Sequence, residues 1–231
     1  MRIRRVGVTL RVVSAFGYNE PRDAISHDWI VWLTKHGIEP VLLSNAAADP
    51  VAYARDANLE GLILTNGNDV VKQENSGNYS YLRNNVEGSL FDWAMAIGLP
   101  VLGICRGMHM INAHLGGKVH ANIQRKNSEV SNHVACQHQI TLFPAFAKCF
   151  GTPSVETNSF HQQGLFMDDL ATDLVAFAMA NDGVVEGIVH RKLPVLAVQW
   201  HPERSGSCRE LDGKLIQSFF LKSVFWKGWS I

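Results

Sequence analysis

The chain of 231 residues is 46% hydrophobic, which is enough to bury a substantial core. Its 21 Lys and Arg residues balance 21 Asp and Glu residues, which argues against a nucleic acid or an anionic membrane surface as a partner. No apolar run reaches the roughly 20 residues of a membrane span, and the four cysteines form no CxxC pair. We therefore expect a single soluble domain, residues 1–231, in the reducing environment of the cytoplasm.

Short apolar runs alternate with longer amphipathic segments in the first half of the chain, a pattern typical of βαβ units and a mostly parallel sheet. Strands are expected at residues 6–12, 40–43, 61–64 and 100–104. Apolar residues at helical spacing indicate two helices that lie on this sheet. The first set is Ile25, Trp29, Trp32, Leu33 and His36, and the second is Val86, Leu90, Trp93, Ala94 and Ile97.

The second half of the chain has the pattern of antiparallel hairpins, with short apolar runs bounded by turn residues such as Asn-Asp-Gly at 181–183. Hairpin strands are expected at 138–142, 173–180, 184–190 and 193–200, followed by an amphipathic segment at 211–226. The polar stretch 72–80 is expected to be a surface loop. The fold class is therefore α/β, a central, mostly parallel sheet flanked by helices, with a smaller antiparallel hairpin region.

The stretch "GICRGMHM" places Cys105 between Gly103 and Gly107, directly after an apolar run. Glycines two residues before and two after a nucleophile allow a strand to turn sharply into a helix, because a side chain at either position would collide with the crossing backbone. The pattern predicts that Cys105 is a catalytic thiol.

A thiol nucleophile needs a base, and the base needs a group that orients it. The stretch "VQWHPE" offers both, because in an extended segment His201 and Glu203 point to the same side. The carboxylate can then accept a hydrogen bond from one imidazole nitrogen while the other nitrogen faces Cys105. The alternative is a turn at the end of a strand with solvated polar side chains.

"GICRGM", followed about 95 residues later by "VQWHPE", resembles the class I glutamine amidotransferase superfamily. The resemblance covers nearly the whole chain, because "LILTNGNDV" (62–70) is similar to the family's oxyanion strand and "NSFHQQG" (158–164) to its γ-glutamyl-binding loop. It implies a glutamine amidotransferase-like fold, with Cys105 as nucleophile, His201 as general base and then acid, and Glu203 as the orienting carboxylate. It also implies an oxyanion hole formed by the backbone N–H groups of Gly67 and Arg106, although Gly67 could equally be an ordinary turn residue.

Two residues depart from the amidotransferase pattern Cys-Leu-Gly-x-Gln. Arg106 follows the cysteine, which resembles the stand-alone γ-glutamyl hydrolase branch, typified by γ-glutamyl-γ-aminobutyrate hydrolase. His109 stands where the family has the Gln that contacts the glutamyl group, and it is expected either to replace that contact or to be a packed helix residue.

The same resemblance implies a loop that holds the α-amino and α-carboxylate groups of the substrate, the alternative being a polar hairpin loop. Its residues are Asn158, Ser159, Phe160, His161 and Gln162. No metal is expected, because His133, Cys136 and His138 fit no common zinc spacing, and the resemblance implies no cofactor.

The predicted function is hydrolysis of the γ-amide bond of a small-molecule γ-glutamyl substrate, with release of glutamate. The leaving group stays open between a nucleotide amidate of capsule phosphoramidate biosynthesis, a polyamine-derived amine and a folyl polyglutamate. For an anionic leaving group, Lys72 and Arg83 are the candidate partners, unless they are solvated surface charges. The alternative function is a glutaminase subunit that delivers ammonia to a synthase partner, although such a partner is not expected.

Overall fold

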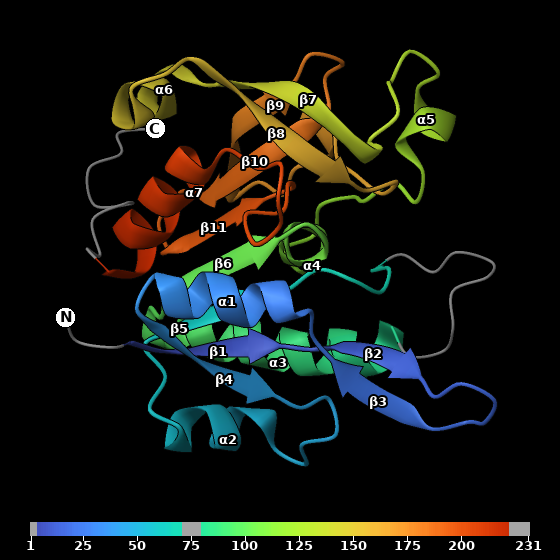
Figure 1. Ribbon diagram of the computed structural model, residues 1–231, viewed down its shortest axis with the longest axis vertical. Helices are drawn as coiled ribbons and strands as arrows, with labels where there is room; N and C mark the ends of the chain where they lie inside the picture. The colour runs from blue at the N-terminus through green and yellow to red at the C-terminus, as the bar shows by residue number, and fades with distance from the viewer. Residues whose placement is uncertain (1–3, 71–79, 222–231) are drawn as a thin grey trace.

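The computed structural model describes residues 4–70 and 80–221 and has a nine-stranded sheet with helices on both faces (Figure 1). The strand order is β4-β1-β5-β6-β11-β10-β9-β7-β8. The strands are β1 (Arg4–Thr9), β4 (Ile38–Leu43), β5 (Gly61–Leu64), β6 (Val101–Ile104), β7 (Val134–Leu142), β8 (Ser154–Phe160), β9 (Leu174–Ala180), β10 (Val185–His190) and β11 (Val195–Val198). The predicted α/β fold class is confirmed.

The strand direction reverses between β11 and β10. The pairs from β4 to β11 are parallel, and those from β11 to β8 are antiparallel. The predicted hairpin region therefore extends the same sheet, and a separate two-stranded sheet is formed by β2 (Arg11–Ser14) and β3 (Pro21–Ala24).

Two apolar cores lie on the two faces of the sheet. One is completed by Trp29 and Leu33 of α1 and by Leu215 of α7, and the other by Leu90 of α3 and Met108 of α4. The helices are α1 (His27–Lys35), α2 (Pro50–Asp56), α3 (Ser80–Ile97), α4 (Arg106–His114), α5 (Ile123–Lys126), α6 (Pro144–Phe150) and α7 (Arg209–Ile216), with a 3₁₀ turn η1 (Met167–Asp169) and a π turn η2 (Gln217–Leu221). No helix in the described ranges is long and apolar enough to cross a membrane.

The predicted helices form, with one difference in the faces they bury. Ser26 caps α1 by accepting a hydrogen bond from the Asp28 backbone N–H. Of the predicted apolar stripe, Trp29, Trp32 and Leu33 are buried, whereas Ile25 and His36 are half-buried and flank the helix. In α3 the buried stripe begins earlier than predicted, with Arg83 and Glu87, while Ile97 is 59% exposed. The apolar pattern could not indicate this, because the two charged residues are buried by pairing with each other.

Some predicted boundaries were wrong. The strand expected at 6–12 breaks at Leu10, because the side-chain amide of Asn45 donates a hydrogen bond to the Leu10 carbonyl and the residues that follow pair with β3. Sequence reasoning missed β3, α2, α5, α6 and β8 and placed the start of β7 four residues late. Of the loop expected at 72–80 only Ser80 is described, and it begins α3; residues 222–226 of the last predicted segment also lie outside the described residues.

Candidate active site

Cys105 lies at a sharp turn between β6 and α4 and has φ of +52° and ψ of −103°. A non-glycine residue with such a φ is strained, and strain of this kind is typical of functional sites. The flanking glycines are required by space: a Cβ on Gly107 would lie 2.1 Å from the Leu64 carbonyl oxygen, and one on Gly103 would lie 2.8 Å from Ala197 Cβ. The elbow therefore has the form that the sequence predicts.

The segment that carries His201 leaves the sheet beside this elbow. Strand β11 runs parallel to β6, and the Cys105 N–H donates to the Val198 carbonyl over 2.8 Å. Two parallel neighbours end at the same edge of a sheet, which brings residues after β11 to the thiol. His201 Nδ1 lies 2.8 Å from Glu203 Oε1, so Nε2 is the nitrogen that remains for Cys105.

The charges around His201 favour its protonated form. Burial alone would lower its pKa, but the negative charges of Cys105 and Glu203 outweigh burial and raise the pKa to about 9. His201 and Glu203 are both buried, so the pair is poorly screened by water. At neutral pH the imidazole is therefore an imidazolium paired with Glu203, and its Nε2 makes no hydrogen bond within the described residues.

Asn158 holds the His201 backbone from both sides. Its Oδ1 accepts from the His201 N–H over 2.8 Å, and its Nδ2 donates to the His201 carbonyl over 2.9 Å. Asn66 supports Glu203: its Oδ1 accepts from Trp29 Nε1 over 3.2 Å while its Nδ2 lies 3.4 Å from Glu203 Oε1. Sequence reasoning placed Asn158 in the substrate loop, but this buried amide is occupied by the backbone of the candidate base.

The loop after β5 brings Gly67 to the same site. Gly67 has φ of +84°, a conformation that glycine adopts without strain. The next residue, Asn68, pairs with the Val12 backbone, accepting from its N–H over 2.9 Å and donating to its carbonyl over 2.8 Å. This pairing anchors the loop to β2.

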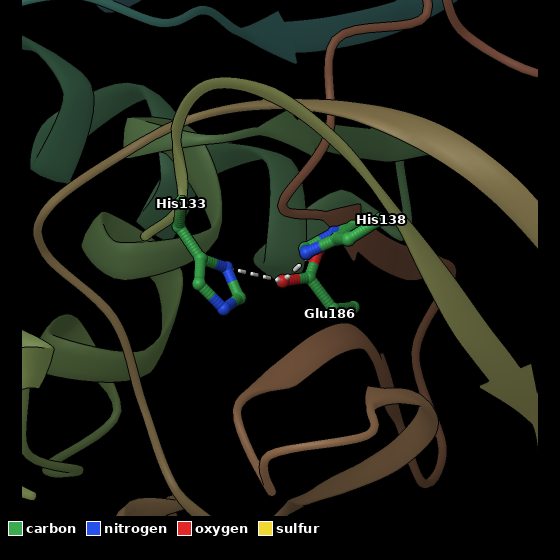
Figure 2. Close-up of side chains that lie close together, drawn as sticks. All are labelled: His133, His138 and Glu186. Atoms are coloured by element: carbon green, nitrogen blue, oxygen red, sulfur yellow. Dashed lines mark ion pairs between the residues drawn. The ribbon is translucent and has the colours of Figure 1, made fainter. Parts of the chain in front are cut away.

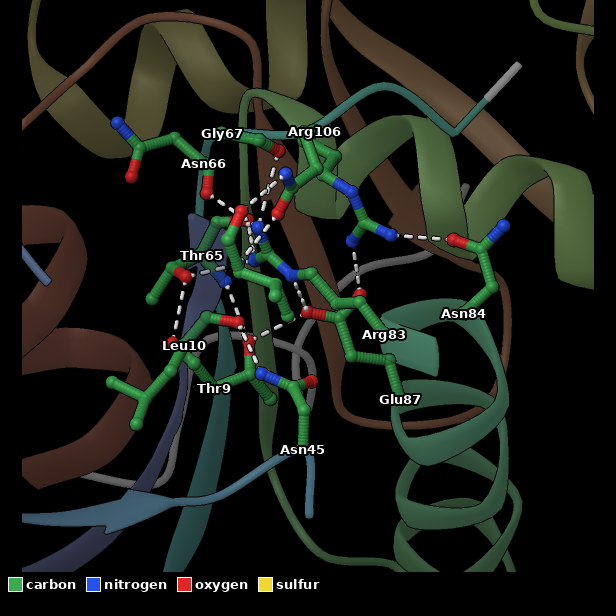
Figure 3. Close-up of polar contacts among 12 residues, drawn as sticks. Thr9, Leu10, Asn45, Thr65, Asn66, Gly67, Arg83, Asn84, Glu87 and Arg106 are labelled. Carbon is green, nitrogen blue, oxygen red and sulfur yellow. Dashed lines mark hydrogen bonds and ion pairs between the residues drawn. The ribbon is translucent and has the colours of Figure 1, made fainter. Parts of the chain in front are cut away.

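A buried ionic network lies beneath the loop and the elbow (Figure 3). Arg83 donates to Glu87 over 2.8 Å and to the carbonyls of residues 65, 66 and 67 over 2.7–3.1 Å. Glu87 also accepts from Thr9 over 2.7 Å and from Arg106, whose other guanidinium nitrogen donates to Asn84.

The network corrects one prediction. Arg83 was expected to face a leaving group, but it is fully buried and its donors hold the loop 65–67. Burial and nearby Arg106 lower its pKa to about 10, so it stays charged at neutral pH. Lys72, the other residue expected to face a leaving group, lies outside the described residues.

A cavity of about 320 Å³ opens over the thiol. It is lined by Gly67, Asn68, Asp69, Cys105, Arg106, His109, Val134, Phe160, His161, Gln162 and Gln163. Of the predicted site residues, Asn158, Ser159, His201 and Glu203 are not on this lining. The Ser159 hydroxyl donates to the His133 carbonyl over 2.8 Å. Asp69 was missed, although its position two residues after Gly67 was a usable signal.

Three of the lining residues have defined surroundings. His109 is both packed and at the pocket: its Nε2 lies 2.7 Å from Gln199 Oε1, and burial lowers its pKa to about 3, which keeps it neutral. Phe160 meets His201 edge-on, with ring centroids 5.5 Å apart. Burial also raises the pKa of Asp69, whose carboxyl group stands in the cavity wall.

Comparisons with known proteins agree with this architecture. A glutamine amidotransferase-like protein of Lactococcus lactis, YvdE, is 30% identical over 174 residues, which cover 70% of this chain and 73% of the relative. The γ-glutamyl-CDP-amidate hydrolase of Campylobacter jejuni is 26% identical over 212 residues, covering 90% and 94%. A solved structure of a GMP synthase subunit from Thermoplasma acidophilum has a TM-score of 0.70, covers 98% and 97% of the two chains and shares 16% identity.

The last of these likenesses concerns the fold alone, whereas the family match concerns the sequence. The Peptidase C26 family matches residues 6–203, a range that includes the elbow, the loop after β5 and the segment from His201 to Glu203. This chain therefore belongs to the Peptidase C26 family, within the class I glutamine amidotransferase-like superfamily.

Proposed function

We propose that the protein is a cysteine-dependent γ-glutamyl hydrolase. Membership of the Peptidase C26 family supports a hydrolase activity in general. The observation that carries the finer proposal is the placement of Cys105 at a strained elbow, beside a buried His201–Glu203 pair and on the wall of a cavity. A thiol, an oriented imidazole and nearby backbone amides are the parts that acyl transfer requires.

In the proposed reaction the Cys105 thiolate attacks the γ-carbonyl carbon of the substrate. The carbonyl oxygen takes the negative charge and is stabilised by the N–H groups of Gly67 and Arg106, the latter at the start of α4. The C–N bond then breaks, and His201 gives its proton to the leaving amine. Water attacks the thioester while His201 takes a proton from it, and glutamate and the free thiol are released.

The raised pKa of His201 refines this sequence of steps. Because the imidazole is already protonated at neutral pH, it holds the proton that the leaving amine needs before Cys105 attacks. His201 therefore acts first as the acid and acts as a base only in the hydrolysis of the thioester. The reaction needs nothing beyond the substrate and water.

The cavity supports a glutamyl group as the recognised part of the substrate. Its volume of about 320 Å³ lies at the lower end of the roughly 300–1,000 Å³ of ligand pockets, which suits a small charged group. Asp69 is the carboxylate on its wall and is placed to pair with the α-ammonium group. Gln162 also lines the cavity, and its amide is the donor proposed for the α-carboxylate.

For the leaving group we propose a nucleotide amidate, because a relative that matches 90% of this chain is a γ-glutamyl-CDP-amidate hydrolase. With Arg83 buried, a further candidate cation is Arg204, whose guanidinium lies 4.7 Å from the centre of the Phe160 ring. Its Nε also lies 3.4 Å from Glu203 Oε1, so Arg204→Gln is expected to change kcat for every substrate. It is expected to raise KM for a γ-glutamyl nucleotide amidate and to leave KM for a γ-glutamyl alkylamide unchanged.

The test of the chemistry uses the purified chain alone. Mixing it with a γ-glutamyl amide and quenching rapidly is expected to give a protein heavier by one glutamyl group, with the label on Cys105, and release of free glutamate. Cys105→Ala is expected to abolish both, and Cys149→Ala, which removes an exposed thiol, to change neither. Turnover by Cys105→Ala contradicts the mechanism, and activity that appears only when a second protein is added favours the synthase-coupled glutaminase.

A further inference from the structure

Three histidines and a buried carboxylate converge beside the cavity, and one of these histidines, His161, also lines it. His133 Nδ1, His138 Nε2 and His161 Nε2 lie 3.5, 3.6 and 3.4 Å from Glu186 Oε1. His133 Nδ1 and His161 Nε2 are 3.1 Å apart. Figure 2 shows His133 and His138 pointing at Glu186 from two sides. We propose that these four side chains bind a divalent transition metal ion, with Zn²⁺ as the preferred ion.

The tautomers of His133 and His161 follow from the hydrogen-bond acceptor on the outer side of each ring. His133 Nε2 lies 2.9 Å from Asp182 Oδ2, and His161 Nδ1 lies 2.9 Å from the Gln163 carbonyl. Both partners accept hydrogen bonds, so these two ring nitrogens carry the protons. In the neutral rings the inner nitrogens then present lone pairs to each other and to the carboxylate. Such an arrangement needs a positive charge at its centre, and a histidine that donates its outer N–H to a carboxylate or carbonyl is the usual form of a metal ligand.

The polar atoms of the cluster lack other partners. Glu186 is 0% exposed, and neither of its carboxylate oxygens makes a hydrogen bond within the described part of the chain. His138 Nε2 is likewise buried without a hydrogen bond among the described residues. A buried carboxylate in this condition is costly unless a cation compensates it.

The distances suit a small tetrahedral ion. Bonds of about 2.0–2.2 Å to zinc place tetrahedral ligand atoms about 3.4 Å apart. The ligand atoms of His133, His138 and Glu186 all lie within 4.8 Å of one another, with 3.5 and 3.6 Å from the two imidazoles to Glu186. His161 Nε2 meets two of these three residues, at 3.1 Å from His133 and 3.4 Å from Glu186. Three imidazoles favour zinc and its transition-metal neighbours over magnesium or calcium, which prefer oxygen. With four protein ligands the site is closed, as in structural zinc sites.

A β-bulge creates the site. The odd separation of His133 and His138 would place them on opposite faces of a regular strand. The register between β7 and β8 shifts between Val134 and Cys136, and Ala135 there has φ of +53°. The extra residue brings both imidazoles to one face, where they meet His161, the residue that follows β8, and Glu186 of β10. The expectation of no metal considered only 133–138, and the fold adds the two ligands that were distant in sequence.

Access is available from outside the substrate cavity. A second cavity of about 520 Å³ is lined by His138 and Asp182. His161 is not on its lining and lines the substrate cavity instead. An ion entering there would tie the start of β7 and the end of β8 to β10. Since His161 is also on the wall of the substrate cavity, the ion would fix that wall without touching the thiol.

The experiment is a Zn²⁺ titration of the purified chain after dialysis against a chelator, followed by calorimetry and by elemental analysis of the washed protein. We expect one zinc per chain. His138→Gln is expected to weaken binding by at least about 100-fold, and Asp182→Asn, which removes only the outer partner of His133, by about 10–100-fold. His120→Gln is the matched control, because His120 also lies 2.9 Å from a carboxylate, that of Asp169, but outside the cluster.

A thermal readout separates binding at the cluster from binding elsewhere. Free zinc at 100 times the dissociation constant is expected to raise the unfolding midpoint of the wild-type chain by about 5–10 °C and to leave His138→Gln unchanged. Binding below one equivalent, or equal affinity in wild type and His138→Gln, overturns the proposal. In that case the positive charge of the cluster is a proton shared by the imidazoles.

Discussion

Replacing Arg83 by Met separates its structural role from a role in substrate binding. The change keeps the apolar stem of the side chain but leaves the carbonyls of residues 65–67 without their buried donor. It also leaves Glu87 with Arg106 as its remaining cation. Breaking a buried ion pair by removing one partner costs about 3–5 kcal/mol, which is a large share of the about 5–15 kcal/mol that stabilises a typical protein.

For a chain of this size the loss corresponds to a fall of about 6–20 °C in the unfolding midpoint. The assay is urea and thermal unfolding followed by tryptophan fluorescence, with kcat/KM for a γ-glutamyl amide measured at a temperature where the variant is folded. We expect kcat to fall, because the loop that carries Gly67 loses its support, while KM changes little. Arg125→Met, at an exposed position, serves as the control. If Arg83→Met kept wild-type stability and raised KM only for substrates with anionic leaving groups, the reasoning would be refuted and Arg83 would be a substrate-binding residue.

Two further predictions concern the candidate base. In the fold the pKa of His201 is about 9, against about 6.5 in an unfolded chain, so its protonation stabilises the fold fully below pH 6.5 and this contribution is lost as the pH rises to 9. Urea midpoints measured from pH 6 to pH 9.5 are expected to fall more steeply for wild type than for His201→Gln, and parallel curves would contradict the shift. Asn158→Ala is expected to lower kcat about 10–100-fold by freeing the His201 backbone, and to leave KM within about twofold; a rise in KM alone would place Asn158 in the substrate loop instead.

The parts of the structure that could be predicted from the sequence are those fixed by local chemistry. The spacing of Trp29 and Leu33 sets the buried face of α1, and Gly103 and Gly107 set the elbow around Cys105. Each of these signals lies within one turn or one strand, so no knowledge of distant residues is needed.

The parts that could not be predicted depend on partners far away in the chain. Arginine is a residue type that usually lies at the surface. Arg83 becomes a buried donor only because the loop 65–67 packs against it. Asn158 lies within a polar stretch that resembles a binding loop, yet its partner is the backbone 43 residues later. Glu186 occurs in an apolar strand, far in sequence from the three imidazoles, and strands β7 and β8 bring them to it.

The position of β11 in the sheet has a consequence for how the enzyme is made on the ribosome. This strand lies between β6 and β10, so it joins the parallel and antiparallel halves, although it is the last strand in the described part of the chain. Until it emerges, β6 keeps an open edge, and the segment with His201 is not yet available to Cys105. Long-range pairing of this kind is slow to form and exposes such an edge to association with other chains. The nascent protein therefore brings His201 to Cys105 and closes its sheet in one late event, and a chain truncated before β11 would lack the proposed base and be prone to aggregate.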